Sequence, residues 1–458
     1  MNSNSTDTRL GTLPIPKLMV SLAVPSVVAQ IINVLYSIVD RIYIGHMESV
    51  GDLALTGVGV TFPIIMLISA FSYFVGSGGA PLASIQLGKG NKEKAEQILS
   101  NGTTLLVFFS IVLMVFFFLF KTPLLYIFGA SDQTIGYAND YLDIYLLGTI
   151  FVQFALGLNP FITSQGRSDI AMISVLIGAI TNIILDPIFI FLFGLGVKGA
   201  AIATVISQAL SAIWIVYFLT SKRSTIRIRK RYLKPDFSII KRIASLGISP
   251  FIMQSTESLI NIILNRGLQM YGGDLYVGSM TIIQSVMQLI VVPTQGFTQG
   301  IQPIISYNFG AGQFDRVKQT IRYTICITFS LTIIACILTT QFPGFFASLF
   351  NKNEELLQIV VQVMPIFMAG IFMFGLQMGF QTAFMGLGQA KISLFLALLR
   401  KVILLAPLAI ILPRIFHTVT SIYYAEPISD IISATTACLI FMVTRHKILS
   451  KQALEKLG

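Results

Sequence analysis

Long runs of apolar residues dominate the chain and are separated by short polar segments. The hydrocarbon core of a bilayer is about 30 Å thick, so a membrane-spanning helix needs about 20 predominantly apolar residues. The runs are continuous rather than short and alternating, which favours helices over a transmembrane β-barrel. We therefore predict an all-α integral membrane protein with transmembrane helices at residues 18–43, 53–85, 98–120, 135–158, 170–193, 199–219, 243–270, 277–305, 321–342, 357–383, 392–412 and 418–443.

Composition narrows the possible function classes. Hydrophobic residues make up 54% of the chain and charged residues only 11%, whereas a soluble domain carries about 25% charged residues. There is no Walker motif and no credible catalytic triad, so we expect neither an enzyme nor an ATP-driven transporter. The three cysteines, Cys326, Cys336 and Cys438, lie inside apolar runs without metal-ligand spacing. We therefore expect no disulfide framework, no zinc site and no resident cofactor.

The distribution of basic residues predicts the orientation in the membrane. Most of the 31 Lys and Arg residues lie in the N-terminus, the even-numbered loops and the C-terminus, and only Lys121, Lys198, Lys352 and Arg414 lie in odd-numbered loops. Because Lys and Arg are retained on the cytoplasmic side, we predict a multi-pass protein of the inner (plasma) membrane with both termini cytoplasmic. The same rule explains the net charge of +11, so we expect contact with membrane lipid and no nucleic-acid partner. The polar segment before the first span lacks a signal-peptide pattern.

The chain contains an internal repeat. Prolines, glycines and polar residues of the first six spans recur in the last six in the same order at a nearly constant offset, as in Pro25/Pro250, Asp40/Asn265, Pro81/Pro303, Gly88/Gly310, Gly166/Gly388, Ala203/Ala425 and Ser207/Ser429. We predict a first lobe at residues 1–220, a basic cytoplasmic linker at 221–237, and a second lobe at 238–458. Six spans per lobe place both lobes in the same orientation, so a pseudo-twofold axis along the membrane normal and alternating access are expected.

Polar residues in the fifth predicted span indicate a cation site. Asn182 and Asp186 are four residues apart and share a helix face, and Pro187 deprives an upstream carbonyl of its usual donor. Asp40 of the first span and Thr204 of the sixth can add a carboxylate and a hydroxyl. Hard cations prefer such oxygen ligands, and a carboxylate pair can also hold a proton, because like charges repel strongly in a low dielectric. The alternative is a helix kink at Pro187 with a satisfied side chain.

The second lobe has different chemistry at the matching positions. Glu257, Glu426 and Asp430 lie within apolar runs, where an ionised group is costly unless it faces protein or water. They predict an acidic patch facing a central cavity. The alternative is a structural role, with Arg400, Lys401 or Arg266 as buried partners.

Cavity walls are predicted from amides and from adaptable apolar side chains. We expect Glu257 and the amides to give the cavity its polar groups and Met and Phe to give it a surface suited to varied ligands. The candidates besides Glu257 are Gln153, Asn159, Gln284, Gln288, Met253, Met280, Met287, Phe154 and Phe161.

Taken together, these features resemble the multidrug and toxic compound extrusion (MATE) family of bacterial secondary transporters. The resemblance covers nearly the whole chain: a proline in span one followed by Asp40, the glycines flanking Lys89 after span two, Asn182 with Asp186, and the run from Ala425 to Asp430. It implies a V-shaped fold of two six-helix bundles that exports organic cations or other drugs in exchange for Na⁺ or H⁺. It also implies that Asp40, Asn182, Asp186 and Thr204 bind the coupling ion, Na⁺ being the only metal expected.

The resemblance also sets the alternatives. Glu257 is similar in place to an acidic residue that some members use in the second lobe, but its usual partner in span ten is absent here. We expect a monomer whose partners are small drug-like molecules. A lipid-linked oligosaccharide flippase of the same superfamily is the alternative function, and a passive channel is a third.

Overall fold

The computed structural model describes residues 5–47, 51–350 and 353–455, and within these ranges it contains helices and no strand. Each predicted span corresponds to one helix or to consecutive helical segments. The elements are α1 (Ser5–Thr12), α2 (Ile15–Gly45), α3 (Gly51–Gly88), α4 (Lys92–Ile127), α5 (Ile135–Leu147), α6 (Thr149–Thr163), α7 (Ser168–Pro187), η1 (Ile188–Leu192), α8 (Gly196–Thr220), η2 (Lys230–Tyr232), α9 (Phe237–Gly272), α10 (Asp274–Gly310), α11 (Phe314–Gln341), α12 (Pro343–Ser348), α13 (Glu354–Met368), α14 (Ile371–Gly386), α15 (Ala390–Leu398), η3 (Leu399–Leu405), α16 (Ala406–Phe416), η4 (Val419–Tyr424), α17 (Ala425–Ile448) and α18 (Lys451–Glu455).

The helices have the length and apolarity of membrane spans. Among the described residues, nine helices are long and apolar enough to cross a bilayer, or eleven if each of two bent pairs counts as one span. The remaining predicted span, residues 243–270, lies in α9, which has 36 residues but is not among the helices that meet this criterion. The protein is thus an all-α, multi-pass membrane protein.

Two glycines break spans at matching places in the two lobes. The α5–α6 pair bends by 61° at Gly148, and the α13–α14 pair bends by 41° at Gly370. A Cβ on Gly148 would lie 2.5 Å from Val205 of α8, and one on Gly370 would lie 2.4 Å from Pro427 of α17. Only glycine permits such a close approach. Gly148/Gly370 and Val205/Pro427 share the offset of the repeat, so the two lobes fold alike.

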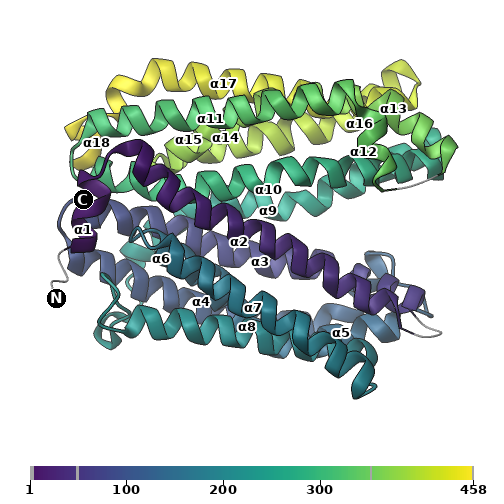
Figure 1. Ribbon diagram of the computed structural model, residues 1–458, viewed down its shortest axis with the longest axis horizontal. Helices are drawn as coiled ribbons and strands as arrows, with labels where there is room; N and C mark the ends of the chain where they lie inside the picture. Colours follow the sequence, from purple (N-terminus) through teal and green to yellow (C-terminus); the bar gives the residue numbers. More distant parts are fainter. Residues whose placement is uncertain (1–4, 48–50, 351–352, 456–458) are drawn as a thin grey trace.

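At one end of the molecule, a helix of each lobe packs against the core of the other lobe. Figure 1 shows α1, α18 and both chain ends at this end, with α2, α3, α9 and α10 between the outer helices of the lobes. Leu18 and Leu22 of α2 pack in a core to which the second-lobe helices α10, α11, α14 and α17 contribute most of the other residues. Ile243 and Leu246 of α9 pack in a core built mainly from first-lobe helices. Packing therefore crosses the predicted boundary between the lobes.

The basic linker is bound to the first lobe. Oε1 of Gln165 accepts hydrogen bonds from Ser224, Thr225 and Ile226, at 2.8–3.2 Å. The buried Glu96 carboxylate pairs with Arg229 at 3.0 Å. These contacts fix the linker against α4 and the loop after α6, and they place the start of α9 beside the first lobe.

Candidate cation and substrate site

Asn182 and Asp186 lie side by side near the end of α7. Nδ2 of Asn182 donates a hydrogen bond of 3.1 Å to Oδ1 of Asp186, and the two residues are 1% and 0% exposed. Pro187 is the last residue of α7, and the π-helix η1 begins at Ile188. Short π-helical segments occur frequently at functional sites, because they re-aim the side chains of a helix.

Asp40 reaches the same place from α2. Its carboxyl group lies close to the Asp186 carboxyl group. Within the described part of the chain, no donor reaches Oδ1 of Asp40, Oδ1 of Asn182 or Oδ2 of Asp186, although all three atoms are buried. Buried polar atoms nearly always have a partner. These oxygens are therefore positioned to accept a cation or a proton.

The carboxylates of this cluster lack a direct basic partner among the described residues. In the described ranges, neither Asp40 nor Asp186 forms an ion pair with a lysine or arginine. Arg41 follows Asp40 in the chain, but its guanidinium lies over the Phe62 ring, 5.3 Å from the centroid. Arg41 therefore acts on Asp40 without pairing with it, and a bound cation or proton can supply the direct partner that the two carboxylates lack.

Thr204 and two tyrosines complete the surroundings. The Thr204 side chain lies beside that of Tyr141 of α5, and both Tyr141 and Tyr36 lie near Asp40. Asp40 and Asp186 do not themselves line the adjacent cavity, whereas Asn182, Thr204 and Tyr36 do. The sequence-based prediction did not include either tyrosine as a site residue. The signal for Tyr36 is its position one helical turn before Asp40, while Tyr141 lies in another span.

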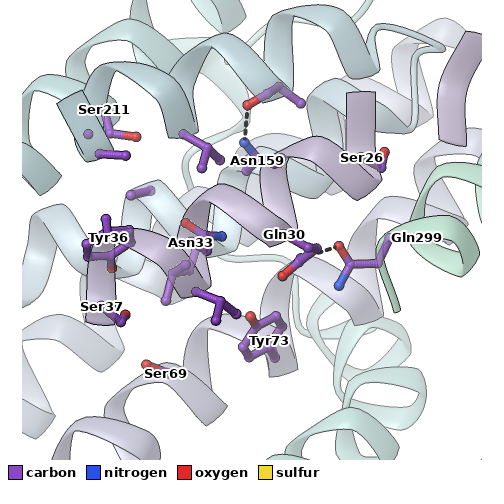
Figure 2. A pocket seen from close by; sticks show the side chains of 18 of the residues that line it. Ser26, Gln30, Asn33, Tyr36, Ser37, Ser69, Tyr73, Asn159, Ser211 and Gln299 are labelled. Carbon is purple, nitrogen blue, oxygen red and sulfur yellow. Dashed lines mark hydrogen bonds between the residues drawn. The ribbon is translucent and has the colours of Figure 1, made fainter. Parts of the chain in front are cut away.

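A cavity of about 740 Å³ opens beside the cluster. It is walled by α2, α3, α6, α7 and α8, with α9 and α10 of the second lobe along its edge. Figure 2 shows Gln30, Asn33, Tyr36 and Tyr73 on its wall. Gln30 Nε2 donates a 2.8 Å hydrogen bond to Gln299 Oε1, so one pair of amides joins the two lobes at the cavity wall. A cavity of this size with scattered polar groups can hold a drug-sized molecule.

Two of the predicted cavity residues line this cavity, namely Asn159 and Gln288. Nδ2 of Asn159 is held by Ser174 Oγ at 2.8 Å and by the Ala171 carbonyl at 3.0 Å. The polar lining residues Gln30, Asn33 and Gln208 were not predicted. They lie on helices whose polar residues are few, but sequence alone does not show which face turns toward a cavity.

The predicted apolar lining is corrected by the structure. Phe161 and Met280 are fully buried in the packed cores, and Phe154 and Met287 pack against those cores. Gln153 is also fully buried, and its amide donates to the Ile68 carbonyl at 2.8 Å. Large side chains fill interhelical space in this conformation, so the cavity forms where small and polar residues leave room.

Two more predicted lining residues also lie elsewhere. Gln284 donates a 2.9 Å hydrogen bond to Asn261 of α9. Met253 lies beside Gln381, with its sulfur 4.0 Å from Nε2 of that amide. Neither residue lines the cavity.

The acidic residues of the second lobe are held by bases, in contrast to the predicted cavity-facing patch. Arg400 pairs with Glu426 and with Asp430, at 2.7 Å each. Lys401 pairs with Glu257, also at 2.7 Å. Glu426 and Asp430 are buried, and Glu257 does not line the cavity. The physical reason is that a carboxylate buried without a partner is costly, so the neighbouring bases of η3 fold onto it.

Comparison with known proteins gives a consistent picture. The MatE family model matches residues 25–188 and again residues 250–411. The multidrug export protein MepA of Staphylococcus haemolyticus is 25% identical over 438 residues, and that of Staphylococcus aureus strain N315 is 24% identical over 435; each match covers 95% of both chains.

Solved structures share the fold. A crystal structure of MATE in the bent conformation superposes with a TM-score of 0.89 at 23% identity, covering 99% of both chains. An outward-facing multidrug resistance MATE family transporter of the MOP superfamily gives a TM-score of 0.88 at 23% identity over the full length of both chains.

Proposed function

Because the family model covers most of both lobes, this chain belongs to the MatE family of membrane transporters, and we propose that it is a secondary active multidrug antiporter. It exports amphipathic organic compounds, principally cations, in exchange for Na⁺ or H⁺ by alternating access. The names of the staphylococcal relatives, multidrug export proteins, support the drug class. The end that carries both termini faces the cytoplasm, in keeping with its basic loops.

The observation that carries this proposal is the set of buried oxygens without a donor on Asp40, Asn182 and Asp186, next to the drug-sized cavity. Leaving such atoms unsatisfied is costly, so the site is suited to a ligand that comes and goes. Two carboxylates and neutral oxygens suit Na⁺ or a proton. Thr204, on the adjoining cavity wall, can add its hydroxyl.

Coupling follows from the position of the cluster between α2 and α7. A cation that draws Asp40 toward Asp186 moves α2 relative to α7, and both helices form the cavity wall. An ion drives transport only if it binds one conformation more tightly than the other. We propose that the ion favours the conformation in which the drug binds weakly, so that its arrival releases the drug.

The electrochemical gradient of the coupling ion limits the drug gradient that the transporter can maintain. One monovalent cation moving down about 100 mV supplies about 2.3 kcal/mol, and a tenfold ion gradient adds about 1.4 kcal/mol. Together they support a roughly few-hundredfold gradient of a neutral drug. For a monovalent cationic drug exchanged one for one, no net charge moves, so only the ion gradient contributes.

The test compares two Asp→Asn substitutions on the same helix. Asp186→Asn should abolish efflux of a fluorescent cation from vesicles given a Na⁺ or pH gradient, because one of the two carboxylates is lost. The control is Asp169→Asn in the first turn of α7, where the side chain is half-exposed and pairs with Arg167. This control should transport normally. Gradient-dependent efflux by a folded Asp186→Asn variant would refute the assignment.

A further inference from the structure

The two lobes differ at one set of matching positions. Near the middle of α7, the first-lobe cavity is bordered by Gly178, with Thr204 and Gln208 of α8 on its wall. The repeat offset pairs these residues with Arg400, Glu426 and Asp430. A small or neutral side chain in the first lobe thus corresponds to a charged one in the second.

Helix contacts support this pairing independently of sequence. A Cβ on Gly178 would lie 3.6 Å from the Ser207 carbonyl oxygen, so α7 passes close to α8 at this point. At the matching point of the second lobe, Ser429 Oγ donates a 2.7 Å hydrogen bond to the Arg400 carbonyl. The Arg400 side chain therefore begins where the cavity borders Gly178 in the first lobe.

The Arg400 guanidinium is bound by the kinds of group that bind an organic cation. Nη2 meets Oε1 of Glu426 and Nε meets Oδ1 of Asp430, both at 2.7 Å. The guanidinium lies over the Phe374 ring, 4.5 Å from its centroid. Two carboxylates and an aromatic face are the groups that recognise an organic cation. Arg400 is 4% exposed, so this space is filled.

The neighbouring base cannot take over this role. Lys401 is held by Glu257 of α9, and in the described part of the chain Arg400 is the one base that forms an ion pair with Glu426 or Asp430. Both bases belong to the π-helix η3. The widened helix presents them to different partners.

We propose that the second lobe contains a site for a small planar organic cation and that the guanidinium of Arg400 is its permanent occupant. The built-in occupant confines transported cations to the first lobe. This inference deepens the proposed function by stating which lobe takes the cargo. Its test measures binding to purified protein rather than transport, so the two proposals can fail separately.

The experiment replaces the occupant by a free one. Arg400→Gly copies Gly178 and should leave a cavity walled by Glu426, Asp430 and Phe374. Methylguanidinium should fill it and raise the melting temperature of the full-length variant saturably, by about 2–4 °C or more at concentrations well above its dissociation constant. Urea, a neutral molecule of similar shape, should have no such effect.

Three controls make the result decisive. The wild-type protein should not respond, because its site is occupied. Arg400→Gly combined with Glu426→Gln and Asp430→Asn should not respond either, because the carboxylates are gone. If Arg400→Gly is unfolded when purified alone, methylguanidinium present during purification should recover folded protein. Any of three results would overturn the proposal. The melting temperature of a folded Arg400→Gly protein could stay unchanged with methylguanidinium, the wild-type protein could be stabilised equally, or an unfolded variant could fail to be recovered.

Discussion

Gly247 of α9 is the position where one added methyl group should disturb alternating access most directly. A Cβ at Gly247 would lie 1.9 Å from the backbone oxygen of Phe74 in α3. This contact joins α9 of the second lobe to α3 of the first lobe, and α3 extends from here to the end of the molecule that carries both termini. Under alternating access, we expect the state that opens the cavity at this end to separate α3 from α9 here. Gly247→Ala should therefore favour that state over the present one.

The magnitude follows from the overlap. Real Cβ atoms essentially never approach another heavy atom closer than 3.0 Å, so the two backbones must move apart by about 1 Å in a close-packed interface. Inserting a methyl group into such packing costs about 1–3 kcal/mol. If the separated state is free of this strain, the conformational equilibrium shifts toward it by about fivefold to 150-fold.

Spin labels at the exposed residues Lys92 and Asp315 report on this end of the molecule, in a background without the three native cysteines. Gly247→Ala should add or enlarge a population with a longer distance between the labels. The matched control is Gly59→Ala in α3, where a Cβ would meet nothing within 4 Å. It should leave the distances unchanged and stabilise the helix by about 0.5–1 kcal/mol.

An unchanged distance distribution in a folded Gly247→Ala protein that still exports drug at the wild-type rate would refute the reasoning. It would mean that α3 and α9 move apart in neither state, or that the interface absorbs a methyl group without strain.

Two further predictions concern other parts of the chain. Arg316→Ala should loosen α1, because Arg316 donates hydrogen bonds to the Leu13 carbonyl at 2.8 Å and to the Leu10 carbonyl at 3.2 Å. Hydrogen exchange of the backbone amides of residues 9–13 should then accelerate about tenfold or more. The control, Lys318→Ala on the exposed face, should not change this exchange rate. Glu257→Gln should leave the buried Lys401 without its carboxylate and so lower the melting temperature. The free energy of unfolding should fall by about 1–3 kcal/mol, because Glu257 is half-exposed. Adding Lys401→Met should restore the stability, and a drug profile that changes while stability does not would contradict this structural role.

The fold could be predicted from sequence because each span must satisfy its own backbone hydrogen bonds in lipid. Hydropathy therefore located the helices. It could not locate the bends at Gly148 and Gly370, because the apolar run continues through each of them and the cause is a neighbour on another helix. Nor could it show that the start of α9 packs into the first lobe, since this depends on where the linker docks on Gln165 and Glu96.

The candidate site was predictable in part for a similar reason. Asn182 and Asp186 are four residues apart on one helix, so local geometry brings them together. The cavity residues were harder to predict. An apolar side chain such as Phe161 is equally suited to filling a core and to lining a cavity, and the packing of other helices decides between the two. Met280 was mispredicted on the same ground.

The contrast between the lobes also bears on which buried acids carry function. Arg41 and Arg266 occupy matching positions, and both are exposed and make no ion pair with these acids in the described ranges. The second lobe has two more bases within its spans, and each takes a carboxylate partner. In the first lobe, Arg41 lies near Asp40 but forms no ion pair with Asp40 or Asp186 in the described ranges. Where a base pairs with the acid, the acid is fixed; where no base pairs with it, we expect an ion that arrives and leaves. Introducing a base into the first-lobe cavity eight residues before Asp186, as in Gly178→Arg, should therefore stop coupling while leaving a folded protein. Gradient-driven efflux by that variant would break the link between an unpaired acid and an exchangeable ion.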